Sequence, residues 1–220
     1  MAMETVTYEN GVNGVNFYDA YITDDPDSGS GSGTPYKLGV VSGKTGNSIK
    51  RSIFQVDISD IPKSATIFDA SLALNVTATS GTDAVQVHGM ISGDQDWDKN
   101  DIAYPKWSNK SSSTAWSVSG GGRKGAVLNC GTLPTSTGTF TLDLTYLVSR
   151  AYRYEGKVMN ICLFLSNESL ASARNITFKT SSASSNKPVL TVKYVEGLGV
   201  GGKTRLSQYR TKSTRRKHRK

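Results

Sequence analysis

The feature of this sequence that most constrains its fold is an apolar pattern that repeats at every second residue. In 52–58 (SIFQVDI), Phe54, Val56 and Ile58 fall on one face of an extended chain, and the residues between them fall on the other. Side chains of a β-strand alternate between its two faces, so this spacing is typical of a strand with one buried face. The pattern predicts that extended chain dominates the fold.

Other β-rich runs of similar length follow along the chain, separated by Gly, Ser, Asn, Asp and Pro. We expect strands at 17–22, 36–41, 65–77, 84–90, 138–144, 158–165, 175–180 and 188–195. The one run with helical character is 146–154, and Gly156 is expected to end it. Many short strands, frequent turns and one brief helix are typical of an all-β chain folded as an antiparallel β-sandwich, most naturally a jelly roll.

The basic residues are concentrated at the C-terminal end. Of the 26 Lys and Arg residues, nine lie in 203–220, which has no acidic residue: Lys203, Arg205, Arg210, Lys212, Arg215, Arg216, Lys217, Arg219 and Lys220. The remaining 17 basic residues stand against 18 acidic ones, so the rest of the chain carries a net charge of −1. We divide the chain into an N-terminal segment at 1–16, a sandwich at 17–196, and a glycine-rich hinge with a flexible basic tail at 197–220.

Two interpretations of the basic tail (203–220) are open. A block of like charge with few apolar residues can serve as a solvated tail that keeps the protein soluble. It can also be an arm that anchors the chain on an acidic partner, either a protein surface or nucleic acid, with a gain from released counterions. We favour the anchoring arm, and we expect nucleic acid to be contacted only through it.

Seven short segments, in this order, resemble those of the DNRLRE-type domain family. They are 19–22 (DAYI), 38–40 (LGV), 51–62 (RSIFQVDISDIP), 65–72 (ATIFDASL), 140–145 (FTLDLT), 178–181 (FKTS) and 187–194 (KPVLTVKY). The resemblance spans about 180 residues. It implies a jelly-roll β-sandwich of the kind found in bacterial surface and secreted proteins, some of which bind carbohydrate.

Four aromatic residues gather in a loop-rich region and are candidates for contact with a glycan: Trp97, Tyr104, Trp107 and Trp116. Exposed rings of this kind stack on sugars, while carboxylates and amides bond the hydroxyl groups. The alternative is that the rings are buried at the end of the sandwich, because large aromatic side chains dominate small cores.

Two other stretches suggest ligands. Asp94, Asp96 and Asp98 alternate along one loop and are a candidate calcium site, although the spacing of an EF-hand is absent and an acidic surface loop is the simpler interpretation. The glycine-rich stretch 119–125 resembles a phosphate cradle, but it lacks the spacing of a P-loop, so we expect a flexible loop. We expect no other metal and no cofactor.

The sequence argues against an enzyme. It has two histidines and two cysteines, and we find no set of nucleophile, base and orienting group. His88 lies inside a predicted strand, and Cys130 and Cys162 are expected to be buried thiols. No apolar run is long enough to cross a membrane, and the N-terminus has no apolar stretch typical of a secretory signal.

These observations favour a virion structural protein of a tailed phage, made in the host cytoplasm. It would be a head-decoration, head-fibre or tail-associated protein, with an exposed sandwich, a basic tail docked on other virion proteins, and a homo-oligomeric state. The alternative is a carbohydrate-binding module of an extracellular surface or secreted protein. A third class, a nucleic-acid binder acting through the basic tail, is also open, and a virion protein can in addition contact a host glycan.

Overall fold

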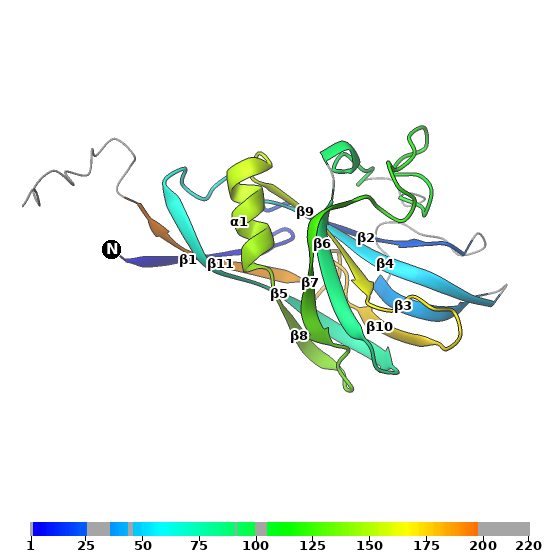
Figure 1. Cartoon of the computed structure of the whole chain (residues 1–220). Helices are drawn as coiled ribbons and strands as arrows, with labels where there is room; N and C mark the ends of the chain where they lie inside the picture. The colour runs from blue at the N-terminus through cyan, green and yellow to red at the C-terminus, as the bar shows by residue number, and fades with distance from the viewer. Residues whose placement is uncertain (1, 26–35, 44–45, 91, 100–104, 198–220) are drawn as a thin grey trace, which may run out of the picture.

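The fold is an antiparallel β-sandwich with one helix, as the sequence predicts (Figure 1). The computed structural model describes residues 2–25, 36–43, 46–90, 92–99 and 105–197. The elements are β1 (Met3–Glu9), β2 (Phe17–Thr23), β3 (Tyr36–Gly43), β4 (Gly46–Asp57), β5 (Ala65–Ser80), β6 (Ala84–Met90), the short 3-10 helix η1 (Ser92–Asp94), β7 (Arg123–Thr132), β8 (Gly138–Asp143), α1 (Thr145–Tyr154), β9 (Val158–Leu165), β10 (Arg174–Phe178) and β11 (Val189–Glu196).

Two long strands connect the layers of the sandwich because each changes its neighbour part-way along. On one side, β4 pairs first with β3 and then with β9, while β2 lies along its other side. In the same way, β5 pairs with β11 over its first half and with β10 towards its end. The strand order is β1-β11-β5-β10-β3-β4-β9-β6-β7, with β2 and β8 attached to β4 and β5.

The alternating pattern of 52–58 is confirmed. Phe54, Val56 and Ile58 are fully buried in the main core, which also receives side chains from β5, β9 and β11. The opposite face of β4 is covered as well, because Ile53 is fully buried in a second, smaller hydrophobic cluster. This strand is therefore buried on both faces, which the alternation alone does not predict.

The strand following Pro62 begins as expected, and the turn before it is closed locally. The backbone N–H of Ser59 donates to Oδ1 of Asp57 at 2.8 Å, so this carboxylate satisfies a free amide at the end of β4. Helix α1 ends as the sequence predicts, with Gly156 at φ +66° in the left-handed region that favours glycine.

Two strands differ from the sequence-based prediction. Within the segment 1–16, residues Met3–Glu9 form β1, which pairs with β11 over seven consecutive residues. The stretch 119–125, expected to be a flexible loop, contains three buried glycines and the beginning of β7. No helix in the described part of the chain is long and apolar enough to cross a membrane.

Candidate functional site

The described residues between η1 and β7, at 92–99 and 105–122, cover the outer face of the β2–β4–β9–β6 part of the sheet, and we call them the loop segment. Trp97 is 1% exposed and Trp116 is 5% exposed, and both belong to the second hydrophobic cluster with Ile53 and Cys162. The indole N–H of Trp116 donates to the backbone carbonyl of Lys106 at 2.6 Å. For Trp97 and Trp116 the structure therefore favours the other interpretation given above, burial at the end of the sandwich, because a buried ring has no face open to a sugar.

Trp107 is half-buried, and a cationic side chain lies over the face of its ring. The guanidinium of Arg51 lies 4.7 Å from the ring centre, donates to both carboxylate oxygens of Glu168 at 2.9 and 2.7 Å, and donates to the carbonyl of Gly120 at 2.8 Å. These contacts fix the end of the loop segment to β4. Tyr104, the fourth predicted glycan contact, lies outside the described residues.

Two of the three predicted calcium ligands, Asp94 and Asp96, are bonded to donors of the protein, and the third, Asp98, is half-buried. Asp94 is fully buried and accepts hydrogen bonds from the N–H and Oγ–H of Ser117 and from the N–H of Gly122, at 2.8, 3.0 and 2.9 Å. Asp96 forms an ion pair with Lys110 at 2.5 Å, and this hydrogen bond holds the pKa of Asp96 below its usual range. Among the described residues, no group of three His, Cys, Asp or Glu side chains is placed to hold a metal ion.

The glycine-rich stretch is not a phosphate cradle. The backbone N–H of Gly120 donates to the carbonyl of Trp107 at 2.7 Å, that of Gly121 to the carbonyl of Val118 at 3.1 Å, and that of Gly122 to Asp94. These three amides therefore already donate hydrogen bonds within the protein, and none of them is available to bind an anion. Gly120 has φ +83°, a backbone angle that favours glycine, and a Cβ atom there would lie 2.6 Å from Nη1 of Arg51, so a side chain would displace the guanidinium.

A hollow of about 400 Å³ opens beside Arg51, and we call it the Arg51 hollow. The described residues that line it are Arg51, His88, Val118, Ser119, Gly121 and Phe164. His88 is buried, its ring lies 5.3 Å from that of Phe164, and its Nδ1 is 2.9 Å from the carbonyl of Gly89. Burial is the largest single influence and lowers the pKa of Arg51, but the hydrogen bond to Glu168 and the nearby negative groups together raise that pKa above its ordinary value, so this side chain stays a permanent cation.

The two thiols are in apolar surroundings. Cys162 is fully buried, and burial raises its pKa to about 12. Cys130 is half-buried, and burial likewise raises its pKa to about 11. A thiol with a raised pKa is a poor nucleophile at neutral pH, so the prediction of a buried thiol is confirmed for Cys162 and holds in part for Cys130.

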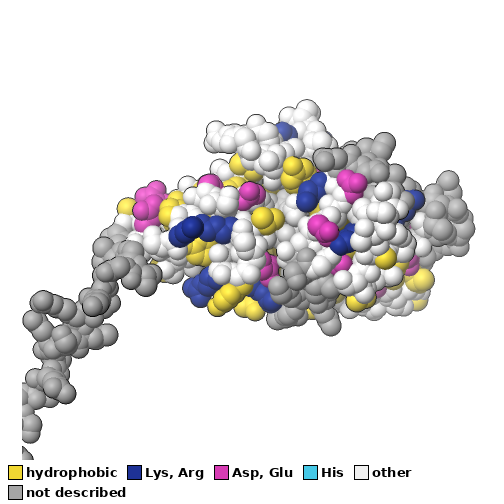
Figure 2. All heavy atoms as spheres, turned by 90° about the horizontal axis from the view of Figure 1, so that it is seen from above, with side chains coloured by type: hydrophobic (Ala, Val, Ile, Leu, Met, Phe, Trp, Pro, Cys, Tyr) yellow, Lys and Arg dark blue, Asp and Glu magenta, His cyan; other side chains and the backbone are white. Residues whose placement is uncertain are grey.

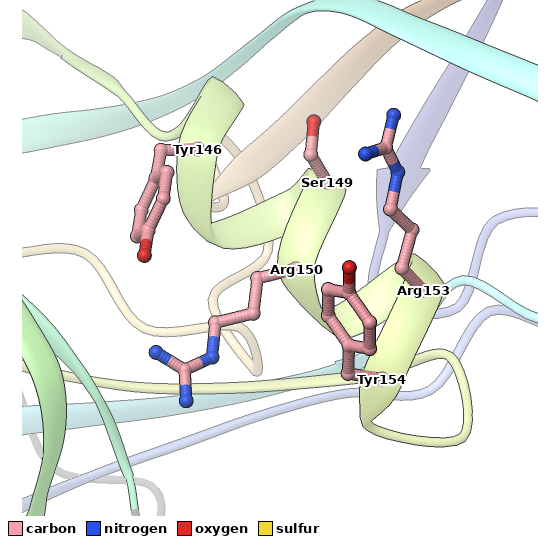
Figure 3. A pocket seen from close by; sticks show the side chains of 5 residues that line it. All are labelled: Tyr146, Ser149, Arg150, Arg153 and Tyr154. Atoms are coloured by element: carbon pink, nitrogen blue, oxygen red, sulfur yellow. The ribbon is translucent and has the colours of Figure 1, made fainter.

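The outer side of α1 presents a second hollow, of about 530 Å³, which the sequence analysis missed (Figure 3). Two rows of side chains, each at a spacing of four residues, line it; we call this set the α1 face, and it consists of Tyr146, Ser149, Arg150, Arg153 and Tyr154. Tyr154 is 76% exposed and Tyr146 is 51% exposed, while Leu147, Val148 and Ala151 anchor the opposite side of the helix in the core.

The charges of the α1 face are only partly neutralised. Arg150 donates to Glu155 at 3.1 Å, while Arg153 is exposed and no partner is recorded for it among the described residues. In the view of Figure 2, basic and acidic side chains of the sandwich are interspersed rather than gathered in one large patch of a single sign. The spacing of tyrosine and arginine along 146–154 was the signal in the sequence that could have revealed this surface.

The nine basic residues predicted to anchor the chain, 203–220, lie outside the described residues. Comparison of the sequence with protein-family models gives no match, and comparison with curated proteins gives none either.

Proposed function

We propose that this protein is a non-enzymatic virion structural protein of a tailed phage, located on the head or associated with the tail. In this proposal the sandwich is displayed on the particle and the basic tail (203–220) anchors it to other virion proteins. The observation that carries the proposal is the separation of charge, because nine basic residues are confined to 203–220 while the rest of the chain carries a net charge of −1.

The positions at which β1 begins and β11 ends support separate roles for the sandwich, which is displayed, and the basic tail, which anchors it. Met3 of β1 lies opposite Val195 of β11, so the strand that leads into the basic tail ends at the same end of the sandwich as the N-terminus (Figure 1). The described loops between β6 and β7 lie away from β1 and the end of β11 in Figure 1, so in this proposal they stay available for display. The resemblance to DNRLRE-type jelly rolls, which occur at bacterial surfaces, is compatible with this role.

The experiment that tests the proposal is a sedimentation assay with purified particles that lack the protein. We expect the full chain to co-sediment with the particles at a saturable stoichiometry. A chain that ends at Gly202 should remain in the supernatant, as should a full-length chain whose nine basic residues are replaced by Gln. The Gln variant is the matched control, because it keeps the length of the tail and removes only its charge.

The outcomes separate the two parts of the proposal. If the protein is absent from purified particles by mass spectrometry and does not bind them, it is not a virion component. If all three chains bind equally, the virion role survives and the anchoring role of the tail is lost. If the full chain instead binds duplex DNA with a steep dependence on salt, and the Gln variant does not, nucleic acid is the acidic partner of the tail.

The second candidate function, carbohydrate binding, is favoured by the α1 face rather than by the predicted tryptophans. Tyr146 and Tyr154 offer exposed rings, and Ser149 and Arg153 offer hydrogen-bond donors beside them (Figure 3). Glycan-array binding that is lost in Tyr154→Ala, and retained in Trp107→Ala, would support this function on this surface. Binding that is lost in Trp107→Ala alone would instead place it near the Arg51 hollow.

A further inference from the structure

Strand β1 is an outer edge of the sheet. It stands first in the strand order and pairs with β11 alone among the described strands, with seven consecutive residue pairs and no shift of register. The backbone N–H and C=O groups on its other side face away from β11. An edge of this kind is a template on which another strand can pair.

This edge carries few of the features by which soluble proteins usually prevent such pairing. The sequence of β1 is METVTYE, which contains no Lys, Pro or Gly. By contrast, β7 at the other end of the strand order pairs with β6 through two shifts of register, which distort that edge. Because β1 is regular and its only charged residues, Glu4 and Glu9, lie near its two ends, we expect its edge to be covered in the working form of the protein.

The residues of β1 are complementary to a second copy of the same strand. If two β1 strands pair antiparallel about Val6, Thr5 of each copy faces the partner's Thr7, and Glu4 faces the partner's Tyr8. Cross-strand Thr pairs stabilise a sheet, whereas like charges directly opposite one another destabilise it. In this register the two Glu residues of one strand never face those of the other, since Glu9 lies opposite the partner's Met3.

The same register keeps the two faces of the sheet consistent. Tyr8 is buried and Val6 is half-buried on the core side of β1, while Thr5 and Thr7 are exposed on the other side. In an antiparallel pair centred on one residue, even-numbered residues of both strands lie on one face and odd-numbered residues on the other. The core-facing side chains of the two β1 strands therefore lie on the same face of the combined sheet, and no buried side chain becomes exposed.

We propose that β1 is the interface of a symmetric dimer, in which two sandwiches join through antiparallel pairing of their β1 strands about Val6. The interface is isologous, which is the commonest form of protein dimer. It uses residues 3–9 and not the basic tail, so it does not rest on the proposed function, and it gives the expected homo-oligomer a defined surface.

The test compares two double variants that differ only in the sign of one charge. In Thr5→Glu/Thr7→Glu, each new Glu faces a Glu of the partner. In Thr5→Glu/Thr7→Lys, each new Glu faces a Lys of the partner, and the dimer has two added ion pairs. Neither double variant should disturb the fold of the monomer, because Thr5 and Thr7 are exposed and a Glu at position 5 would lie opposite Lys193 of β11.

We expect analytical ultracentrifugation to show a dimer for the native chain. The Glu/Glu variant should be monomeric, or weaker in self-association by at least about tenfold, and the Glu/Lys variant should remain a dimer. A chain that ends at Gly202 should behave like the full chain. Circular dichroism should show the same fold and a similar midpoint of thermal unfolding for both double variants.

Several results would overturn the proposal. A native chain that stays monomeric throughout the concentration series excludes the dimer. Equal self-association of the two double variants places any interface elsewhere. A full chain that is monomeric while the chain ending at Gly202 dimerises means that the C-terminal segment of the same chain covers the β1 edge.

Discussion

At the scale of single residues, Asp19 on β2 is an acidic group held in the interior. It is 3% exposed, and its carboxylate accepts hydrogen bonds from the backbone N–H and the Oγ–H of Ser181, at 2.6 and 2.5 Å. Burial raises the pKa of Asp19 to about 7, although the two hydrogen bonds lower it. The side chain thus connects β2 to the turn after β10, at the cost of a carboxyl group that resists ionisation.

Replacing Asp19 by Asn should change how stability depends on pH. Because the pKa of Asp19 is raised in the folded state, its contribution to stability is complete below its unfolded pKa near 4 and is lost as the pH rises through about 7. Between these two pH values, the free energy of unfolding of the native protein should fall, relative to that of Asp19→Asn, by up to about 1.4 kcal/mol for each unit of pH. Urea unfolding of both proteins from pH 4 to pH 8 measures this difference.

A second variant checks the cause of that effect. Ser181→Ala removes one donor to the carboxylate, so the pKa of Asp19 should rise further and the window of pH dependence should move upward. A difference between the native protein and Asp19→Asn that stays constant with pH would show that the carboxyl group ionises normally in the folded state.

Some residue-level features could be predicted from sequence and others could not. The contact of Asp57 with the amide of Ser59 follows from its position two residues earlier, so local reasoning finds it. The burial of Trp97 and Trp116 depends on Asp94, which holds Ser117 and Gly122 against η1 from more than twenty residues away. Nothing in the local sequence distinguishes a tryptophan under such a loop from an exposed one.

At the scale of elements, α1 has two sides with different roles. Leu147 and Val148 are buried against β5 and β9, whereas Tyr146 and Tyr154 project from the sandwich (Figure 3). A helix of ten residues is not stable by itself in water, so its position depends on the buried side. The exposed tyrosines do not hold the helix in place, so their rings are accessible for contact with a partner.

Substitutions on the two sides of α1 should have different effects on stability. Leu147→Ala should lower the free energy of unfolding by about 2–5 kcal/mol, because it removes buried methyl groups and leaves a cavity. Tyr154→Ala should change it by less than about 0.5 kcal/mol, as expected for an exposed residue. Denaturant unfolding measures both values. A cost above 1 kcal/mol for Tyr154→Ala would mean that the ring packs against the protein in solution.

The strands were predictable where the apolar pattern is strong, as an alternation in β4 and β11 and as a nearly continuous apolar run in β9. Strand β7 is hard to recognise in the sequence because its first residues follow three glycines, and glycine is typical of loops rather than strands. Strand β1 is equally hard to recognise because an edge strand buries few side chains, and so METVTYE carries little hydrophobic pattern.

At the scale of the whole molecule, the chain joins a nearly neutral sandwich to a strongly basic segment. The net charge of +8 belongs to the complete chain, while residues 1–202 carry −1. Charge of this kind governs solubility and association with acidic partners more than it governs the fold. The two parts can therefore be separated by experiment.

Removing residues 203–220 should change the charge behaviour and leave the fold intact. At pH 7 the full chain should bind a cation exchanger and elute with salt, whereas the chain ending at Gly202 should not bind. The midpoint of thermal unfolding should differ by less than about 2 °C, or less than about 1 kcal/mol for a domain of this size. A larger decrease would show that the basic tail packs against the sandwich.

The pairing of β1 with β11 has a consequence for how this fold can be combined with others. Because Met3 and Val195 are neighbours across one ladder, the polypeptide enters and leaves the sandwich at nearly the same point. A domain with adjacent ends can be inserted into a surface loop of a host protein without stretching that loop. The sandwich is thus suited to use as a cassette, carried within a longer polypeptide as readily as at its end.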